Sequence, residues 1–404
     1  MSEIGPPAGV RASGWSRLAE RRTRRLLERL APHETRLVAG NRLALLVDGA
    51  QAFPAMLDAI AHARRQILFE MYWFASDETG RRFARALESA AARGVEVALL
   101  YDSVGSWDSD RALFGSLEDA GVKVLEYGPI RPWERRFRLA RLTRRDHRKI
   151  LVIDGGLGFT GGLNVSDRWL PASEGGAEWR DYMAALEGPA VGSLAELFQG
   201  TWRAQGGPRL GASPPAPANP GVAPRVAVLG ENYAHHRREI VQAYLYNIYR
   251  ATRRVWITNS YFVPDHAVKL ALERAARRGV DVRVLVPGES DVPIVRHASR
   301  AMWGGLLRSG VRIFEWYPSV LHGKTAVIDG EWGTIGSFNL DAQSLRSNLE
   351  VNLAVRDESF ARVLERAFLA DLETAREVDE REFRFRPLGD RLLEFIFYRF
   401  RKLL

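Results

Sequence analysis

Two copies of one short motif constrain this chain more than any other feature of its sequence. The first copy comprises His147, Lys149, Asp154, Gly161-Gly162 and Asn164, and the second comprises His322, Lys324, Asp329, Gly336-Ser337 and Asn339. Both fit the pattern H-x-K-x4-D-x6-G-G/S-x-N, and His322 follows His147 by 175 positions (322 − 147). Average residue frequencies give one chance match about once in ten million sites. Two matches in one chain therefore indicate an internal duplication.

The duplication extends beyond the motif. Arg93-Gly94-Val95-Glu96-Val97 enters an apolar run in the first half, and Arg278-Gly279-Val280-Asp281-Val282 does the same in the second. Strand-like and helical patterns alternate in both halves, which predicts an α/β fold with a largely parallel sheet in each half. We therefore expect two homologous α/β/α sandwich domains related by a pseudo-twofold axis, with an active site at their interface.

Composition places the boundary between the halves. Residues 206–225 contain six prolines together with several Gly and Ala, which is typical of a semi-rigid linker. The predicted organisation is a basic N-terminal segment (1–36), a first domain (37–205), the linker (206–225), a second domain (226–380) and a basic amphipathic C-terminal segment (381–404).

The residue types in the motifs suit the chemistry of a phosphodiester. Lys149 and Lys324 can neutralise the phosphoryl oxygens, and Asn164 and Asn339 can donate hydrogen bonds to them as charge develops. One imidazole can attack phosphorus while the other protonates the leaving oxygen. We expect the Gly pair in each motif to let the backbone approach a ligand closely. This scheme requires no metal and no cofactor, and the sequence contains no spacing typical of metal ligands.

Carboxylates near the motifs complete the predicted site. An imidazole nucleophile needs an acceptor on its other ring nitrogen, and Asp181 and Glu350 follow the motifs at equivalent repeat positions. They are predicted to orient the histidines. Asp154 and Asp329 belong to the motifs and are counted with the catalytic set, although their position at the ends of strands favours a structural role.

Charge narrows the class of partner. The net charge of +9 favours polyanions, either nucleic acid or a membrane rich in acidic lipids, although a soluble basic surface is the plain alternative. The absence of cysteine excludes disulfides and thiolate metal sites. No secretory signal is visible, and no run approaches the roughly 18 apolar residues of a membrane span. These features predict a cytosolic protein or one on a membrane face.

With these residues identified, the chain resembles the phospholipase D superfamily, whose signature is a pair of H-x-K-x4-D motifs. Three further segments resemble bacterial cardiolipin synthases, in particular the shorter type without transmembrane helices: Asp77-Glu78-Thr79-Gly80, Tyr101-Asp102-Ser103-Val104-Gly105-Ser106 and Tyr261-Phe262-Val263-Pro264-Asp265. The resemblance covers residues from about Leu43 to Asp357.

The resemblance implies a mechanism and a substrate. His147 would attack phosphorus to give a phosphohistidine, and His322 would act as acid and then as base. Two phosphatidylglycerols would give cardiolipin and glycerol. The first motif has Gly162 where many family members have Ser, so a hydroxyl contact to phosphate would be missing there, while Ser337 would retain it in the second motif.

Three segments could hold such an enzyme on anionic lipid. Residues 15–30 and 131–146 combine Trp or Phe with six and seven arginines, and the C-terminal segment has an apolar stripe of Leu393, Ile396, Phe397, Phe400, Leu403 and Leu404. A solvated arm is the alternative for the first segment, and packing on the core is the alternative for the last. We expect a peripheral protein on the cytoplasmic face of the bacterial cell membrane, with no stable nucleic-acid partner.

Two other readings use the same residues. A phospholipase D-type hydrolase, or a metal-independent nuclease, would use water as the acceptor at the same site, because residue types alone do not fix the acceptor. A non-catalytic membrane-binding relative is disfavoured, because both copies of the motif are intact.

Overall fold

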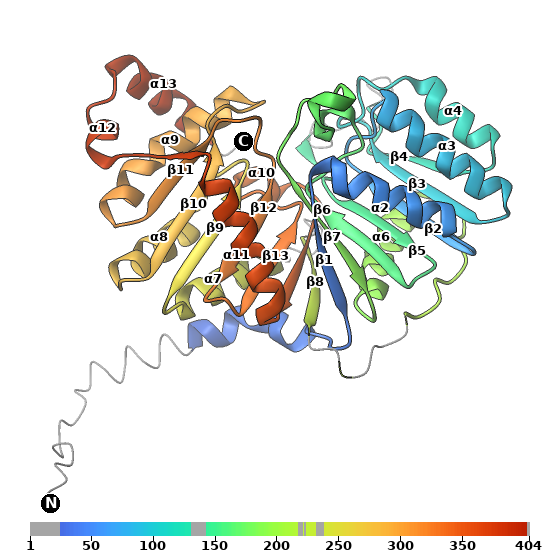
Figure 1. Ribbon diagram of the computed structural model, residues 1–404, viewed down its shortest axis with the longest axis horizontal. Helices are drawn as coiled ribbons and strands as arrows, with labels where there is room; N and C mark the ends of the chain where they lie inside the picture. The colour runs from blue at the N-terminus through green and yellow to red at the C-terminus, as the bar shows by residue number, and fades with distance from the viewer. Residues whose placement is uncertain (1–24, 131–142, 217–220, 222–223, 232–237, 402–404) are drawn as a thin grey trace, which may run out of the picture.

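The computed structural model describes residues 25–130, 143–216, 221, 224–231 and 238–401. Two α/β domains lie side by side, each built on one sheet that is covered by helices (Figure 1). The two-domain α/β fold predicted from the duplication is confirmed.

The first domain contains a seven-stranded sheet. Its strands are β1 (Arg42–Val47), β2 (Gln66–Met71), β3 (Glu96–Asp102), β4 (Lys123–Tyr127), β5 (Lys149–Ile153), β6 (Leu157–Gly161) and β7 (Tyr182–Glu187). Its helices are α2 (Asp48–His62), α3 (Glu78–Ala92), α4 (Arg111–Asp119) and α6 (Val191–Ala204), with short 3-10 helices η2 (Asp167–Trp169) and η3 (Ala172–Glu174).

The second domain contains an eight-stranded sheet. Its strands are β8 (Arg225–Glu231), β9 (Arg254–Asn259), β10 (Asp281–Pro287), β11 (Arg312–Trp316), β12 (Lys324–Ile328), β13 (Trp332–Gly336), β14 (Glu350–Arg356) and β15 (Ala375–Glu377). Its helices are α7 (Glu239–Arg250), α8 (His266–Arg277), α9 (Pro293–Arg308), α10 (Ala342–Arg346), α11 (Glu358–Leu372), α12 (Glu380–Arg384) and α13 (Leu388–Arg399).

The prediction of a largely parallel sheet in each half is wrong. Parallel pairing joins β2, β3 and β4 in one sheet and β9, β10 and β11 in the other. The other ladders between described strands are antiparallel. The reason is that each motif folds as a hairpin, β5–β6 or β12–β13, and a short turn can join only antiparallel strands. Asp154 and Gly155 both have positive φ, as the tight turns of hairpins require.

Three layers of apolar side chains hold the molecule together. Helices α2, α3 and α4 pack on the outer face of the first sheet, and α7, α8 and α9 pack on the outer face of the second. A third cluster contains side chains from both sheets and from α6 and α11, so the two domains share one continuous core. Because this core joins the domains, it fixes the position of one motif relative to the other.

The segments outside the two sheets also pack on the domains. Leu30, in the described part of the predicted N-terminal segment, belongs to the core of the second domain, and Arg36 pairs with Glu239. In the predicted linker, the backbone N–H of Gly211 donates to Glu96 at 3.0 Å. In the described part of the chain, no helix is both long enough and apolar enough to span a bilayer.

Candidate active site at the domain interface

The two motif histidines lie at equivalent places in the two sheets. β5 begins at Lys149 and β12 begins at Lys324, so each histidine precedes its strand by two residues. The ammonium of Lys149 donates to the carbonyl oxygen of His147 at 2.7 Å, and Lys324 makes the same contact with His322. All four side chains are buried. Each motif therefore presents its imidazole and its ammonium together.

Backbone pairing clamps each motif to the opposite domain. The N–H of His147 donates to the carbonyl oxygen of Leu349 at 3.0 Å, and the N–H of His322 donates to that of Arg180 at 2.7 Å. Both contacts extend short parallel bridges between the domains. Consequently the backbone at each motif histidine is held by the residue just before a strand of the other domain, which is Leu349 before β14 or Arg180 before β7.

The carboxylates cross the interface in the same way. His147 Nδ1 lies 3.1 Å from both carboxylate oxygens of Glu350, which belongs to the second domain. His322 Nδ1 lies 2.6 Å from Oδ2 of Asp181, which belongs to the first domain. An N–H on Nδ1 that donates to a carboxylate leaves Nε2 of the same ring as the free basic nitrogen. Each half therefore lacks the acceptor for its own histidine and obtains it from the other half.

The two motif asparagines are anchored through their carbonyl oxygens. Asn164 Oδ1 accepts from the backbone N–H of Trp73 at 3.1 Å, and Asn339 Oδ1 accepts from the hydroxyl of Ser260 at 2.8 Å. Trp73 and Ser260 follow β2 and β9, which are equivalent strands of the two domains. Because the oxygen of each amide is occupied, its NH2 group is the end that can donate to a substrate.

The structure places Asp154 and Asp329 away from this cluster, at the opposite ends of β5 and β12. Each carboxylate accepts backbone N–H donors from three consecutive residues, which are 64–66 for Asp154 and 252–254 for Asp329. Both aspartates have positive φ, 50° and 54°. They fasten the hairpin turn of the motif to the start of a central strand, and they do not contact the imidazoles.

The motif glycines are crowded by protein, contrary to the expectation of close approach to a ligand. A Cβ on Gly162 would lie 2.1 Å from Oδ1 of Asp181, and a Cβ on Gly336 would lie 2.1 Å from the carbonyl oxygen of Val351. The hydroxyl of Ser337, predicted to bind phosphate, donates to Glu350. The first motif therefore has Gly at residue 162 because the Asp181 side chain occupies the space that a larger side chain would need. The second motif has Ser at residue 337, where the hydroxyl donates to Glu350.

Burial dominates the electrostatics of the imidazoles and ammonium groups. It lowers the pKa of His147 below its usual value and that of His322 well below it, and the nearby lysines add to both effects. Burial also lowers the pKa of Lys149 to about 7 and that of Lys324 to about 8. Each lysine acts on the histidine of the other domain as well as its own, so the two motifs form one electrostatic site.

The two orienting carboxylates differ in charge state. Burial raises the pKa of Asp181 to about 6, although Lys324 opposes the increase. Burial also acts to raise the pKa of Glu350, but the charge of His147 and its hydrogen bond outweigh it, so the pKa of Glu350 lies below its usual value. Glu350 therefore remains ionised beside His147 under conditions in which Asp181 begins to take up a proton.

Besides Trp73 and Ser260, sequence reasoning missed Tyr72, Trp169 and Ser344, which also contact the cluster. The Tyr72 ring packs edge-on against His147 with centroids 4.9 Å apart, and the Trp169 indole N–H donates to Asp181 at 3.2 Å. The Ser344 hydroxyl donates to Glu350 at 2.8 Å. The repeat could have indicated Tyr72, because it aligns with Ser260 at the offset that relates Gln66 to Arg254. Trp169 and Ser344 each lie five residues after a motif asparagine, so the 175-position offset of the motifs relates these two residues as well (344 − 169).

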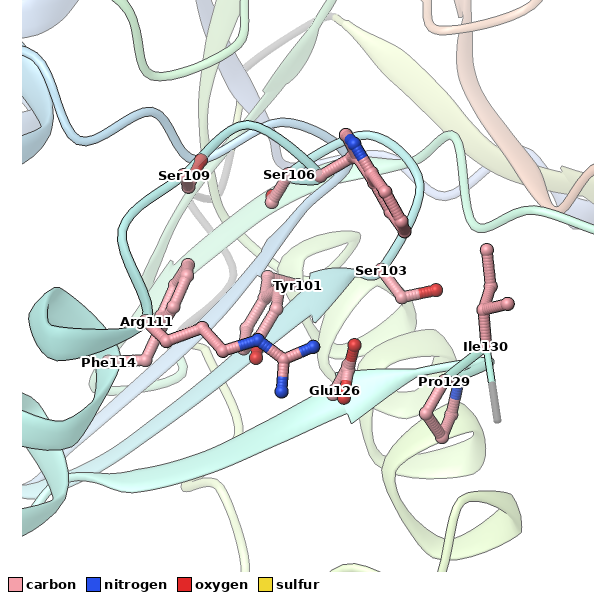
Figure 2. A pocket seen from close by; sticks show the side chains of 10 residues that line it. Tyr101, Ser103, Ser106, Ser109, Arg111, Phe114, Glu126, Pro129 and Ile130 are labelled. Atoms are coloured by element: carbon pink, nitrogen blue, oxygen red, sulfur yellow. The ribbon is translucent and has the colours of Figure 1, made fainter. Parts of the chain in front are cut away.

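A separate small cavity lies beside the β3–α4 connection. Tyr101, Phe114, Arg111 and Glu126 line it, with Ser103 and Ser106 on the connecting loop (Figure 2). Its volume is about 90 Å³, and no motif residue lines it. The Ser106 hydroxyl accepts from the N–H of Phe74 at 3.0 Å, and the preceding residue, Trp73, donates to Asn164.

Two of the predicted lipid-facing segments lie largely outside the described residues. These parts are 15–24 of the first segment and 131–142 of the second. In the C-terminal stripe, Leu403 and Leu404 also lie outside them, whereas Leu393, Ile396 and Phe400 are exposed. Phe397 instead points inward and packs beside His297 with ring centroids 5.6 Å apart.

Known proteins resemble this chain in sequence and in fold. The family described as cardiolipin synthase, PLD-like domain, matches residues 56–200 and 244–372, and each matched segment contains one copy of the motif. Cardiolipin synthase A of Pseudomonas fluorescens strain Pf-5 is 38% identical over 89% of this chain and 75% of its own length. Cardiolipin synthase of Geobacillus thermodenitrificans strain NG80-2 is 36% identical over 91% of this chain and 73% of its own length.

Among solved structures, phosphatidylserine synthase from Haemophilus influenzae Rd KW20 has a similar fold. The match has a TM-score of 0.69 and covers 95% of this chain and 100% of that chain. Because the sequences are only 13% identical, the likeness concerns the fold alone.

Proposed function

We propose that this chain, which belongs to the phospholipase D-like family described as cardiolipin synthase, transfers a phosphatidyl group between two phosphatidylglycerols. The products would be cardiolipin and glycerol, and the intermediate a phosphohistidine. The observation that carries the proposal is the crossed pair of histidines, each held by a carboxylate of the other domain in one buried site. Two imidazoles on one phosphorus atom supply a nucleophile and a proton donor together.

In the first step, Nε2 of His147 attacks phosphorus and the bond from phosphorus to the glycerol headgroup oxygen breaks. The leaving oxygen takes a proton from His322. The ionised Glu350 beside His147 supports this assignment, because it stabilises the positive charge that develops on an attacking imidazole. Lys149, Lys324 and the two asparagine amides bind the phosphoryl oxygens.

His322 takes up its proton from solvent when the substrate binds. Without ligand, burial and the lysines hold the pKa of His322 well below its usual value, so its imidazole is neutral. A bound phosphodiester adds a negative charge that raises this pKa and allows the ring to protonate. In the second step, His322 takes the proton of a terminal glycerol hydroxyl on the second phosphatidylglycerol. That oxygen attacks phosphorus, and the bond to His147 breaks.

The substrates place the protein at a membrane. Phosphatidylglycerol lies in a bilayer, so an enzyme that uses two copies of it works at an anionic lipid surface. The net charge of +9 favours such a surface. We propose peripheral association with the cytoplasmic face of the cell membrane.

The test follows the lipids by mass spectrometry after the purified chain is mixed with phosphatidylglycerol vesicles. We expect cardiolipin and glycerol in equal amounts. His147→Ala and His322→Ala should each lower the rate by about a thousandfold or more, and Asn339→Ala should lower it less, since both lysines remain. An alkaline quench should leave the phosphatidyl group on the peptide that contains His147.

Other products would identify other reactions. Phosphatidic acid without cardiolipin would mean that water is the acceptor and that the chain is a hydrolase. Cleavage of DNA without added metal, and no lipid turnover, would support the nuclease reading. Full activity in either histidine variant would contradict the shared site.

A further inference from the structure

The last helix of the described chain, α13, buries a carboxylate and exposes several large apolar side chains. Glu394 is the one residue of α13 that is fully buried, and its carboxylate accepts from Arg300 at 3.2 Å and from Arg386 at 3.0 Å. Large apolar side chains face outward instead. We call these residues the outer C-terminal face: Phe385, Leu388, Leu392, Phe395, Ile396 and Phe400, which are 81%, 77%, 60%, 62%, 41% and 51% exposed.

Helical geometry gathers the four of these residues that belong to α13 on one side of that helix. Leu388, Leu392, Phe395 and Ile396 are spaced by four, three and one, which places them along one stripe of a helix. Exposure of such a stripe of large apolar side chains to water is unfavourable. Exposed apolar patches of this kind mark interaction surfaces.

The helix is fixed in this orientation by its inner side. Arg300 bridges Glu394 and Glu315, at 3.2 and 3.1 Å, and so links α13 to α9 and β11. Phe397 and Tyr398 pack on Met302 and Val263 of the second domain. Because the inner contacts require this rotation, the apolar residues are held outward.

The charges around the face favour an anionic lipid bilayer as the occupant. Arg384, Arg391 and Arg399 are exposed, while the carboxylates of the same stretch, Asp390 and Glu394, are partly and fully buried. Arginines that flank exposed Phe and Leu suit the headgroup layer, since the guanidinium can reach lipid phosphates while the apolar side chains enter the acyl region.

The inner side of α13 lies near the short helix α10. A cavity of about 280 Å³ lies between the end of α13, at Tyr398 and Arg401, and Leu345 and Arg346 of α10. The same short helix contains Ser344, which donates to Glu350. α13 therefore carries the outer C-terminal face on one side and lies near the helix that supports the carboxylate of His147 on the other.

We infer that the outer C-terminal face is the surface by which this protein docks on an anionic phospholipid bilayer. This inference rests on the proposed function for the choice of a lipid partner. The test pellets the His147→Ala chain with sucrose-loaded vesicles, so that no turnover is needed. One set contains phosphatidylglycerol and phosphatidylcholine, and the other contains phosphatidylcholine alone. We expect strong binding to the first set and weak binding to the second.

Matched variants locate the surface. Leu392→Ser/Phe395→Ser should lower the partition coefficient on phosphatidylglycerol vesicles by about tenfold or more. Val38→Ser/Leu369→Ser changes two apolar residues that are 45% and 42% exposed elsewhere, and should leave it unchanged. Arg384→Glu/Arg391→Glu should weaken binding by about tenfold on phosphatidylglycerol vesicles only. Thermal melting confirms that each variant is folded.

Two results would overturn the inference. The first is equal vesicle binding by the folded Leu392→Ser/Phe395→Ser chain and its parent. The second is a parent that sediments as a dimer without lipid and becomes a monomer with these substitutions, because the face would then bind a second copy of the chain. Vesicle binding without turnover by the unsubstituted chain would count against the proposed function and leave the docking surface intact.

Discussion

The two carboxylates that orient the histidines each lie against a motif residue whose size matters. Asp181 reaches His322 through the space above Gly162, and Glu350, which is longer by one methylene, reaches His147 while it accepts from Ser337. The Gly-Ser difference between two otherwise matching motifs thus corresponds to the difference between Asp and Glu. Gly162, which lacks the hydroxyl of Ser337, leaves the space that Asp181 needs to reach His322 of the other domain.

Gly162→Ala should lower activity by about a hundredfold or more, because the added Cβ would displace the Asp181 carboxylate from His322. Gly156→Ala is the matched control, since a Cβ there meets no atom within 4 Å and activity should persist. The measurement is the rate of cardiolipin formation, with the melting temperature of both variants. A fully active Gly162→Ala enzyme would show that Asp181 does not need this space.

The pKa values of the two motif lysines predict how kcat/KM changes at alkaline pH. Their pKa values are lowered to about 7 for Lys149 and about 8 for Lys324, so both lose their positive charge as the pH rises through this range. Because the cationic forms attract the phosphodiester, kcat/KM should fall as the pH rises through about 7 to 8. The profile is measured in mixed micelles of constant lipid composition, with circular dichroism to exclude unfolding. A kcat/KM that keeps rising to pH 10 would contradict the assigned role of the lysines.

At the scale of elements, the unit of construction is the motif hairpin. β5–β6 and β12–β13 each lie at the centre of a sheet, between parallel strands on one side and antiparallel strands on the other. The aspartate of the motif closes the turn and caps the neighbouring strand with three hydrogen bonds. The motif therefore encodes both the position of the chemistry and the turn that supports it.

Asp329→Ala should destabilise the fold while it preserves catalysis by the folded protein. Three backbone N–H groups would lose their acceptor, at a cost of about 1–3 kcal/mol in the free energy of unfolding. Burial acts to raise the pKa of Asp329, but its backbone hydrogen bonds prevail and lower it. The stabilisation is therefore complete above the unfolded pKa and is lost as the pH falls through the folded one. Urea unfolding and kcat at low temperature test both parts; a large loss of kcat with unchanged stability would assign Asp329 to the chemistry.

Much of this organisation could be predicted from the sequence, because the duplication preserves spacing. Two α/β domains, the motif residues and the positions of Asp181 and Glu350 all follow from comparing the halves. The antiparallel direction of most strands did not follow from the sequence, since the residue pattern of the hairpin turn at Asp154 resembles the end of any strand. Nor did the crossing of the carboxylates, because the partners lie 203 and 141 residues apart and nothing local links them.

At the scale of the whole molecule, the two domains behave as one body. Their sheets share an apolar core, and Arg180 of the first domain pairs with Asp371 of α11 at 2.7 Å and with Asp48 at 2.9 Å. The hydroxyl of Tyr182 donates to the same Asp371. Relative motion of the domains would break both the core and this buried network.

We therefore expect a single cooperative unfolding transition, although the chain has two domains. Tryptophan fluorescence and far-ultraviolet circular dichroism should give coincident curves in urea, because neither domain can expose the shared core alone. Arg180→Ala should shift the midpoint to lower urea by leaving Asp371 buried without its cation. Two separate transitions would contradict this description.

The crossed carboxylates also predict how this sequence varies among its relatives. A lone ancestral repeat could have completed its relay only by pairing with an identical copy, each lending its acid to the other's imidazole. In a single fused chain, a substitution at residue 181 affects the hydrogen bond of His322, and a substitution at residue 350 affects that of His147. Across relatives of this chain, those distant positions should therefore covary more strongly than neighbours within either half.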